Sequence, residues 1–281
     1  MPGAVLSYCA DQVRRHDHDR YLTCLFAPAA RREHLFALYA FNLEVAKTAE
    51  VVSEPMLGQI RLQWWRDAIA GIYAGQAAHH EVSEPLAHAV QQASLTRGHF
   101  DRLIDAREYD LDPEPPESLA GLEDYAEATS SALVLLALEV LGARGDAVET
   151  AGRHGGLAWA LTGLIRAVPF HARQKRLYLP QDVVAQAGLK VGDVFELRSS
   201  AALCGIAERL AARAREHVRT ARAARRDVPK EARSALLLVS LAARELEVLH
   251  RWGYDPFHPR VQARRPGSAW RLAWAHLRGA Y

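Results

Sequence analysis

The sequence predicts an all-α protein. Most segments are rich in Ala, Leu, Arg and Glu, which favour helices. Apolar residues recur three and four positions apart, and stretches of alternating apolar and polar residues, typical of strands, are few. With 281 residues, 49% of them hydrophobic, the chain can bury a sizeable core. We therefore expect residues 1–281 to form a single domain, a helical bundle around a central cavity.

Composition excludes several classes of protein. The 35 Lys and Arg residues against 33 Asp and Glu residues give a net charge of only +2, which argues against a nucleic-acid partner. Cys9, Cys24 and Cys204 are odd in number and have no short CxxC spacing, so neither a disulfide framework nor a thiolate zinc site is indicated. The N-terminus lacks the basic region of a signal peptide, and no apolar run reaches the roughly 18 to 20 residues that cross a bilayer. These features predict a cytoplasmic protein.

Start signals place the first helices. Pro28 precedes a predicted helix through "AARREHLFALYAFNLEVAKTAEVV", whose apolar residues cover more than one face and indicate a central position. The sequence "SEP" predicts a second helix that starts near Glu54 and Pro55 and ends at Gly75. The same signal at Ser83 predicts a third helix to Leu95.

The rest of the chain divides at prolines. "DLDPEPPESLAG" predicts a loop, because its prolines cannot continue a helix. "DPFHPRVQARRPG" predicts an irregular basic connector, and "SAWRLAWAHLRGAY" a terminal amphipathic helix. The other predicted helices cover residues 119–141, 146–168, 180–189, an Arg/Ala-rich stretch that ends before Pro229, and 229–253.

Acidic residues near the end of the first predicted helix are candidates for a metal site. Two carboxylates four positions apart on a helix could hold Mg²⁺, but Glu44 and Glu50 are six apart, and position 46 is alanine. A lone Glu50 cannot make a metal site. We favour ion pairing at these positions, with a metal role as the alternative.

Basic residues form two groups. Arg61 and Arg66 lie beside an aromatic and apolar stripe, and we expect them to pair with acids of the preceding helix. Arg173 and Arg176 precede the helix start "YLP", a combination that can bind phosphate, although a solvated basic turn fits equally well. His171 follows Pro169, which we expect to interrupt its helix, and a structural role is favoured over that of a catalytic base.

The terminal helix allows two interpretations. Trp270 and Trp274 lie four apart on one face, with Arg271 and Arg278 off that face, so the helix could lie on a membrane surface. Arg264 and Arg265 precede it and would add positive charge. The alternative is that both tryptophans pack into the bundle.

Four segments, in the order in which they occur along the chain, resemble those of a known protein family. "LFALYAFN", "RLQWWRDAI", "LEDYAEAT" and "GGLAWALTGLIRAVPFHARQKRLYLPQDV" resemble the squalene and phytoene synthase family over about residues 21–189. That family joins two prenyl diphosphates with Mg²⁺ held by two acidic motifs. The resemblance implies an isoprenoid-synthase fold in which both motifs face one central cavity.

The acidic motifs are largely absent from this chain. The key positions of the first motif correspond to Ala46 and Glu50, and the second motif corresponds to residues 166–171, "RAVPFH". Only Glu50 remains acidic. The resemblance therefore implies that Ala46, Glu50, Ala167 and His171 face each other across the cavity without a metal site.

One branch of the family, the mitochondrial complex I assembly factor, is similar in detail through "FALxAFNxE", "SEP" and "RAxPxH". It implies a non-catalytic assembly or scaffold protein without a cofactor, located at the cytoplasmic face of the inner membrane. Its expected partners are a respiratory-complex subunit or assembly intermediate and an isoprenoid or lipid ligand. The alternative is a magnesium-dependent prenyl-diphosphate synthase of squalene or phytoene type. The residues expected to line the cavity or a diphosphate-like site are Asn42, Glu44, Glu50, Glu54, Arg61, Arg66, Arg166, His171, Arg173, Arg176 and Tyr178.

Overall fold

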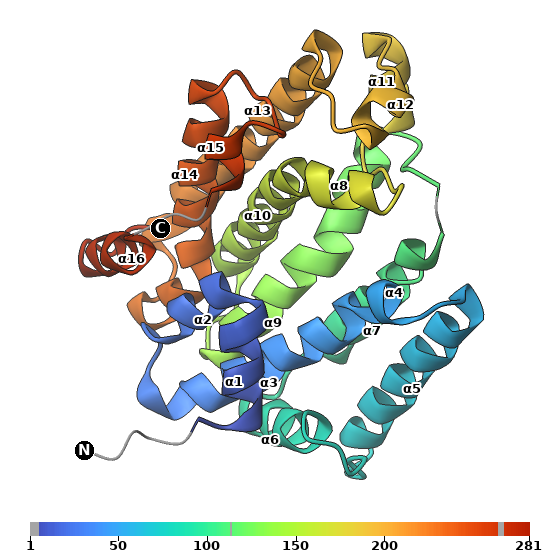
Figure 1. Cartoon of the computed structure of the whole chain (residues 1–281). Coiled ribbons are helices and arrows are strands. Elements are labelled where there is room, and N and C mark those ends of the chain that lie inside the picture. The colour runs from blue at the N-terminus through green and yellow to red at the C-terminus, as the bar shows by residue number, and fades with distance from the viewer. Residues whose placement is uncertain (1–5, 113, 264–266) are drawn as a thin grey trace.

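The computed structural model describes residues 6–112, 114–263 and 267–281, and every regular element in these ranges is helical (Figure 1). The long helices are α3 (Ala29–Ala46), α5 (Pro55–Tyr73), α10 (Asp146–Arg173), α13 (Ala201–Ala223) and α14 (Leu237–Arg251). The shorter α-helices are α1 (Tyr8–His16), α2 (His18–Cys24), α4 (Thr48–Val51), α6 (Ser83–Ala93), α7 (Arg97–Ala106), α8 (Leu119–Ala126), α9 (Ala132–Val140), α11 (Gln181–Ala187), α12 (Val191–Phe195), α15 (Pro259–Gln262) and α16 (Ser268–Leu277). Among the described residues, no helix is both long and apolar enough to span a bilayer.

Helices α9 and α10 lie at the centre of the bundle (Figure 1). Helix α10 packs against α13 and α14 on one side, and α9 packs against α3 and α7 on the other. Buried apolar side chains from helices throughout the chain form one large cluster, from Cys9 and Cys24 near the N-terminus to Tyr281. A small second cluster, Leu22, Leu237, Leu241 and Leu272, lies beneath α16.

The first predicted helix is broken at Lys47. Helix α3 ends at Ala46, and a single further turn, α4, carries Glu50. At the break, the Thr48 hydroxyl donates to the Glu44 carbonyl (3.4 Å). This side-chain bond competes with the backbone amide for the same oxygen and weakens the helix there.

Helix α10 is longer than predicted. We expected Pro169 to interrupt the helix, but α10 continues to Arg173. The proline removes one backbone hydrogen bond about one turn before the helix ends, and the buried side chains of Val168, Pro169 and Ala172 hold this turn against the core. Consequently His171 lies on the helix itself and not in a loop after it.

The predicted helix over residues 119–141 contains a π-helical turn, η2 (Glu127–Ser131), between α8 and α9. The Ser130 and Ser131 hydroxyls of this turn donate to the carbonyls of Gly156 (2.9 Å) and Arg153 (2.6 Å) in α10. A Cβ at Gly156 would lie 2.4 Å from the Ser131 Cα, so glycine is needed for the two backbones to approach this closely.

The C-terminal region also contains details that the sequence did not predict. A 3-10 segment, η4 (Lys230–Leu236), precedes α14, and the expected irregular connector contains the short helix α15. A further 3-10 turn, η3 (Ala224–Arg226), follows α13. Outside this region, the 3-10 turn η1 (Tyr109–Leu111) overlaps the first residues of the predicted proline loop. Arg264 and Arg265 lie outside the described residues.

Candidate functional site

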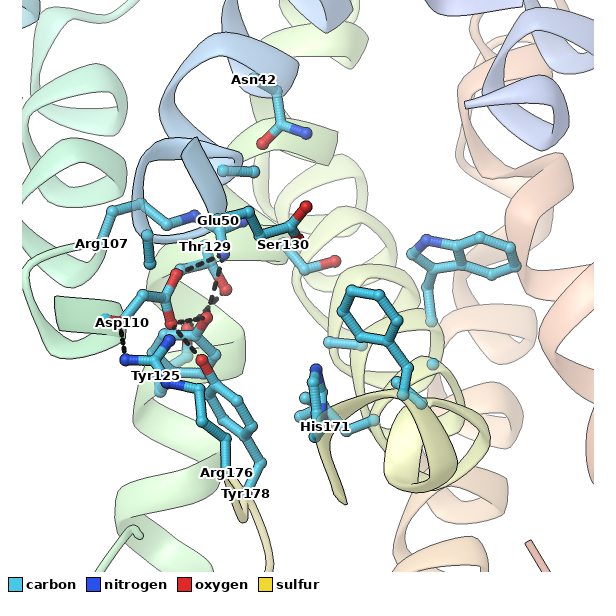
Figure 2. A pocket seen from close by; sticks show the side chains of 18 of the residues that line it. Asn42, Glu50, Arg107, Asp110, Tyr125, Thr129, Ser130, His171, Arg176 and Tyr178 are labelled. Carbon is cyan, nitrogen blue, oxygen red and sulfur yellow. Dashed lines mark hydrogen bonds and ion pairs between the residues drawn. The ribbon is translucent and has the colours of Figure 1, made fainter. Parts of the chain in front are cut away.

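A cavity of about 290 Å³ lies between α3, α8, η2 and α10, at the lower end of the volumes of small-molecule sites. Apolar side chains of α10, Trp159, Leu164 and Phe170, line one side. Polar side chains from η1, α8 and the turn after α10 gather on another side (Figure 2). The remaining wall comes from α3 and α4 and includes Asn42, Ala46 and Glu50.

Asp110 is the centre of the polar wall. Its Oδ1 accepts hydrogen bonds from the hydroxyls of Tyr125 (2.7 Å) and Tyr178 (2.8 Å), and its Oδ2 pairs with Arg107 (3.0 Å). The Arg107 guanidinium also donates to the Tyr125 hydroxyl (2.9 Å), and Arg176 donates to the Asp110 backbone carbonyl. The side chain of Asp110 is almost fully buried. One carboxylate thus joins η1, the end of α7, α8 and the turn after α10 (Figure 2).

Burial fixes the charges in this wall. It raises the pKa of the Tyr125 and Tyr178 phenols, and the nearby Asp110 carboxylate raises both further, so both phenols are neutral donors at pH 7. Burial alone would lower the pKa of Arg107, but Tyr125 and Asp110 more than offset this effect, and the guanidinium stays charged. The wall therefore contains one neutralised ion pair and no free carboxylate.

His171 projects from α10 beside this wall, with its ring 4.5 Å from the Tyr178 ring (Figure 2). Burial lowers the pKa of its imidazole to about 4, since the Asp110 carboxylate opposes the effect only partly and Arg176 adds to it. At neutral pH the imidazole is therefore uncharged. It can donate one hydrogen bond and accept another.

Other buried polar atoms around the cavity lack partners among the described residues. They include the Asn42 Oδ1, on a residue that is 6% exposed, and the Nε atoms of Arg20 and Arg107. The charge of Arg20 is balanced by Asp17, whose Oδ2 lies 2.5 Å from its Nη1. Unsatisfied buried groups of this kind are costly unless water or a ligand pairs with them. The cavity therefore offers unpaired polar atoms to a bound molecule.

Five of the predicted site residues lie at this cavity: Asn42, Glu50, His171, Arg176 and Tyr178. Ala46 and Ala167 line it as well, so the four positions expected to face it from the two motifs all do so.

The other six predicted site residues do not line the cavity. Arg61 of α5 pairs with Glu44 of α3, as expected for a contact between neighbouring helices. Arg66, by contrast, pairs with Asp105 and Glu108 at the end of α7, because its position on α5 faces α7 and not the preceding helix.

Arg166 lies on another face of α10 and pairs with Glu245 of α14 (3.3 Å). Glu54, at the start of α5, and Arg173, in the last turn of α10, are both exposed to solvent.

Sequence reasoning missed the centre of the site. Asp110, Arg107 and Arg20 were not among the candidates, and Tyr125 was quoted only within the segment "LEDYAEAT". One signal was available: Arg107 and Asp110 are three residues apart just before the proline-rich loop, a spacing that allows an ion pair. Nothing in the pattern shows that the pair turns inward.

The side chains at the cavity do not fit a magnesium cluster. Of the two carboxylates there, Asp110 has both oxygens engaged by Tyr125, Tyr178 and Arg107, which leaves Glu50 as the free acid. Ala167 and His171 provide no carboxylate on the α10 side. Within the described residues, no group of three or more His, Cys, Asp and Glu side chains could hold a metal ion. Mg²⁺ requires several oxygen ligands, which these residues do not supply.

Comparison with known proteins agrees with the fold and the sequence motifs. The family profile described as squalene/phytoene synthase matches residues 13–271. The complex I assembly factor 6 of Mus musculus is 34% identical, covering 98% of this chain and 83% of the relative, and the presqualene diphosphate synthase of Rhodopseudomonas palustris is 29% identical, covering 70% of each. Among solved structures, a dehydrosqualene synthase superposes with a TM-score of 0.85 at 18% identity, covering 96% of this chain and 94% of the other. The fold is of the squalene synthase type, and the chain belongs to the squalene/phytoene synthase family.

Proposed function

We propose that this protein is a non-catalytic member of its family that acts in the assembly of respiratory complex I, where it binds a subunit or an assembly intermediate. Two observations support the proposal. The complex I assembly factor 6 of Mus musculus is 34% identical over almost the whole chain. The cavity has alanine or a neutral imidazole at three of the four facing motif positions, Ala46, Ala167 and His171.

The main support for a non-catalytic role is the chemistry of the cavity walls. Release of diphosphate from an allylic substrate needs strong neutralisation of the leaving group, which Mg²⁺ bridged to paired carboxylates can provide. Glu50 alone cannot hold such ions, and Asp110 is already engaged by Arg107 and two tyrosines. Arg176 could attract a diphosphate, but binding substrate and transition state equally does not accelerate the reaction.

The activity test uses the purified full-length protein with Mg²⁺ and farnesyl or geranylgeranyl diphosphate. We expect no magnesium-dependent release of pyrophosphate. Formation of squalene, phytoene or their cyclopropyl precursors, lost in Glu50→Gln but kept in Glu54→Gln, would support the synthase alternative. Glu54 is a suitable control because it is a nearby acid that does not line the cavity.

The assembly test uses the native organism. Deletion of the gene should lower the amount of assembled NADH dehydrogenase in native gels and leave succinate dehydrogenase unchanged. Complementation with Glu50→Gln should restore assembly, because no catalytic carboxylate is needed. A normal amount of the complex in the deletion strain would contradict the assembly role.

We further propose that the cavity holds a neutral isoprenoid or another lipid without a bound metal. Trp159, Leu164 and Phe170 would contact its hydrocarbon part, and the unpaired Asn42 Oδ1 would accept a hydrogen bond from its polar end. Native mass spectrometry of the purified protein should show a bound mass that Asn42→Leu reduces. Equal retention by Asn42→Leu and the wild type would argue against this site.

A further inference from the structure

Helix α16 presents an apolar face to solvent. Trp270, Trp274 and Leu277 are 83%, 59% and 79% exposed. At 100° per residue, these three side chains lie within a narrow sector of the helix, opposite Leu272. Leu272 is buried in the small cluster beneath the helix. The alternative in which both tryptophans pack into the bundle is therefore wrong, and the residue that packs inward is Leu272.

The helix is nevertheless firmly attached to the bundle. It packs on α14 and α2, and the ring of His276 lies 5.4 Å from that of Phe26. Beyond the helix, Arg233 donates to the Gly279 carbonyl (3.1 Å), and Arg222 donates to the Tyr281 carbonyl (2.8 Å). The exposed face is thus held in a fixed orientation on the surface of the fold.

The C-terminal segment that contains this face is basic. After Asp255 the sequence contains no acidic residue, while its arginines are Arg260, Arg264, Arg265, Arg271 and Arg278. Arg271 and Arg278 lie beside the tryptophans on the helix, and the Arg278 guanidinium is 4.5 Å from the centre of the Trp274 ring. Such a contact lets the guanidinium shield the ring without losing its charge.

The last turn of α1 adds to this charge. Arg14, Arg15 and His16 line a groove that Trp270 also borders, and the two arginines share one carboxylate, that of Asp11. Three further acids line the groove: Asp17 pairs with Arg20 and Glu245 with Arg166, while Asp19 keeps a negative charge there.

We propose that the outer face of α16 docks on an anionic lipid bilayer, with Trp270, Trp274 and Leu277 in the interface and Arg271 and Arg278 against the headgroups. Tryptophan and arginine on adjoining faces of one helix suit the boundary between acyl chains and charged headgroups. Charge complementarity favours an anionic membrane as the partner. An apolar protein surface would leave Arg271 and Arg278 without partners of opposite charge. The bilayer contact does not depend on the complex I proposal.

The test is co-sedimentation of the full-length protein with vesicles of phosphatidylcholine alone or mixed with phosphatidylglycerol, at low and high salt. Binding should require the anionic lipid and weaken as salt screens the charges. Trp270→Ala/Trp274→Ala and Arg271→Glu/Arg278→Glu should each lower partitioning on the order of tenfold. Thermal melts should be unchanged, because these side chains point away from the core.

Two control variants match these changes elsewhere on the surface. Met56→Ala/Ile60→Ala removes exposed apolar side chains from α5, and Lys190→Glu/Arg209→Glu reverses two exposed charges near α11 and α13. Both controls should bind like the wild type. Equal binding by the α16 variants and the wild type would overturn the proposal. So would a dimer in size-exclusion chromatography that the α16 tryptophan variant dissociates without any vesicle binding by the wild type.

Discussion

At the scale of single residues, Asp110 is the side chain that holds the polar wall of the cavity together. Its carboxylate balances the buried Arg107 and receives two phenol hydrogen bonds. Removing one partner of a buried ion pair leaves the other charge uncompensated. We predict that Asp110→Asn lowers the free energy of unfolding by about 3 kcal/mol, measured by urea denaturation.

Tyr178→Phe is the matched control for this prediction. It removes one hydrogen bond to Asp110 and keeps the ring beside His171, so the expected loss is about 1 kcal/mol. If Asp110→Asn costs no more than Tyr178→Phe, the ionised carboxylate is not what stabilises the wall.

His171 predicts a dependence of stability on pH. Its pKa in the folded protein is about 4, below the ordinary value of 6.5, because the ring is buried. Between these values the unfolded chain binds more protons than the folded one, so stability decreases as pH falls from 6.5 to 4, by up to about 3 kcal/mol from this residue. His171→Phe should flatten that part of the curve in urea titrations at several pH values.

We expect the His171→Phe variant still to lose some stability as pH falls, because other histidines are also buried. Burial also lowers the pKa of His154 and His217, which lie against each other between α10 and α13. His79→Gln is the control, since that exposed imidazole has a raised pKa from its hydrogen bond with Glu84. An unchanged acid slope in His171→Phe would show that the imidazole is not held neutral by the fold.

The family resemblance could predict which residues reach the cavity where those residues belong to one of the motifs. The motif positions placed Ala167 and His171 at the cavity, although Pro169 was expected to interrupt the helix; α10 continues past Pro169 and contains both residues, four apart. Asp110 could not be found in this way, since it lies in a 3-10 turn whose inward direction depends on Tyr125 and Tyr178 from other segments. The partners of Arg66 could not be predicted either, because the sequence of one helix does not show which neighbouring helix each of its faces contacts.

At the scale of elements, the contact between the π-helical turn and α10 shapes the cavity wall. Gly156 allows the two backbones to meet, and Thr129 and Ser130 of the turn line the cavity. Gly156→Ala would force a Cβ against the Ser131 backbone, and overpacking of this kind costs about 1 to 3 kcal/mol. We predict a corresponding decrease in the melting temperature, measured by circular dichroism.

Gly163→Ala is the control on the same helix. No atom lies within 4 Å of a Cβ at Gly163, and alanine has the higher helix propensity, so stability should rise by about 1 kcal/mol. A loss of stability in both variants would indicate that glycine is needed along α10 for another reason than close packing.

Helix starts were easier to predict than helix ends. Pro55 and Ser83 mark the observed starts of α5 and α6, because the early prolines, Pro55 and Pro85, favour the first turn of a helix; neither start has a side-chain cap. The end of α10 depends on buried packing, which no local pattern reveals, and the break at Lys47 coincides with a hydrogen bond from the Thr48 side chain to the Glu44 carbonyl.

For the whole molecule, we propose that residues 1–281 form a single domain. The main apolar cluster joins Cys9 of α1 to Tyr281, so neither end can unfold without exposing the shared core. We predict one cooperative transition, with equal calorimetric and van't Hoff enthalpies in scanning calorimetry. Two resolved transitions, or different midpoints by near-ultraviolet and far-ultraviolet circular dichroism, would contradict a single unit.

The burial of two of the three cysteines has a practical consequence for labelling the protein. Burial raises the pKa of the Cys9 thiol to about 12 and raises that of Cys24 as well, so neither forms the thiolate that reacts with maleimide in the folded state. Cys204, in the first turn of α13, is partly exposed. A fluorophore added to the native protein should therefore attach at Cys204, on a helix other than α16, and the number of dyes bound per chain should report unfolding.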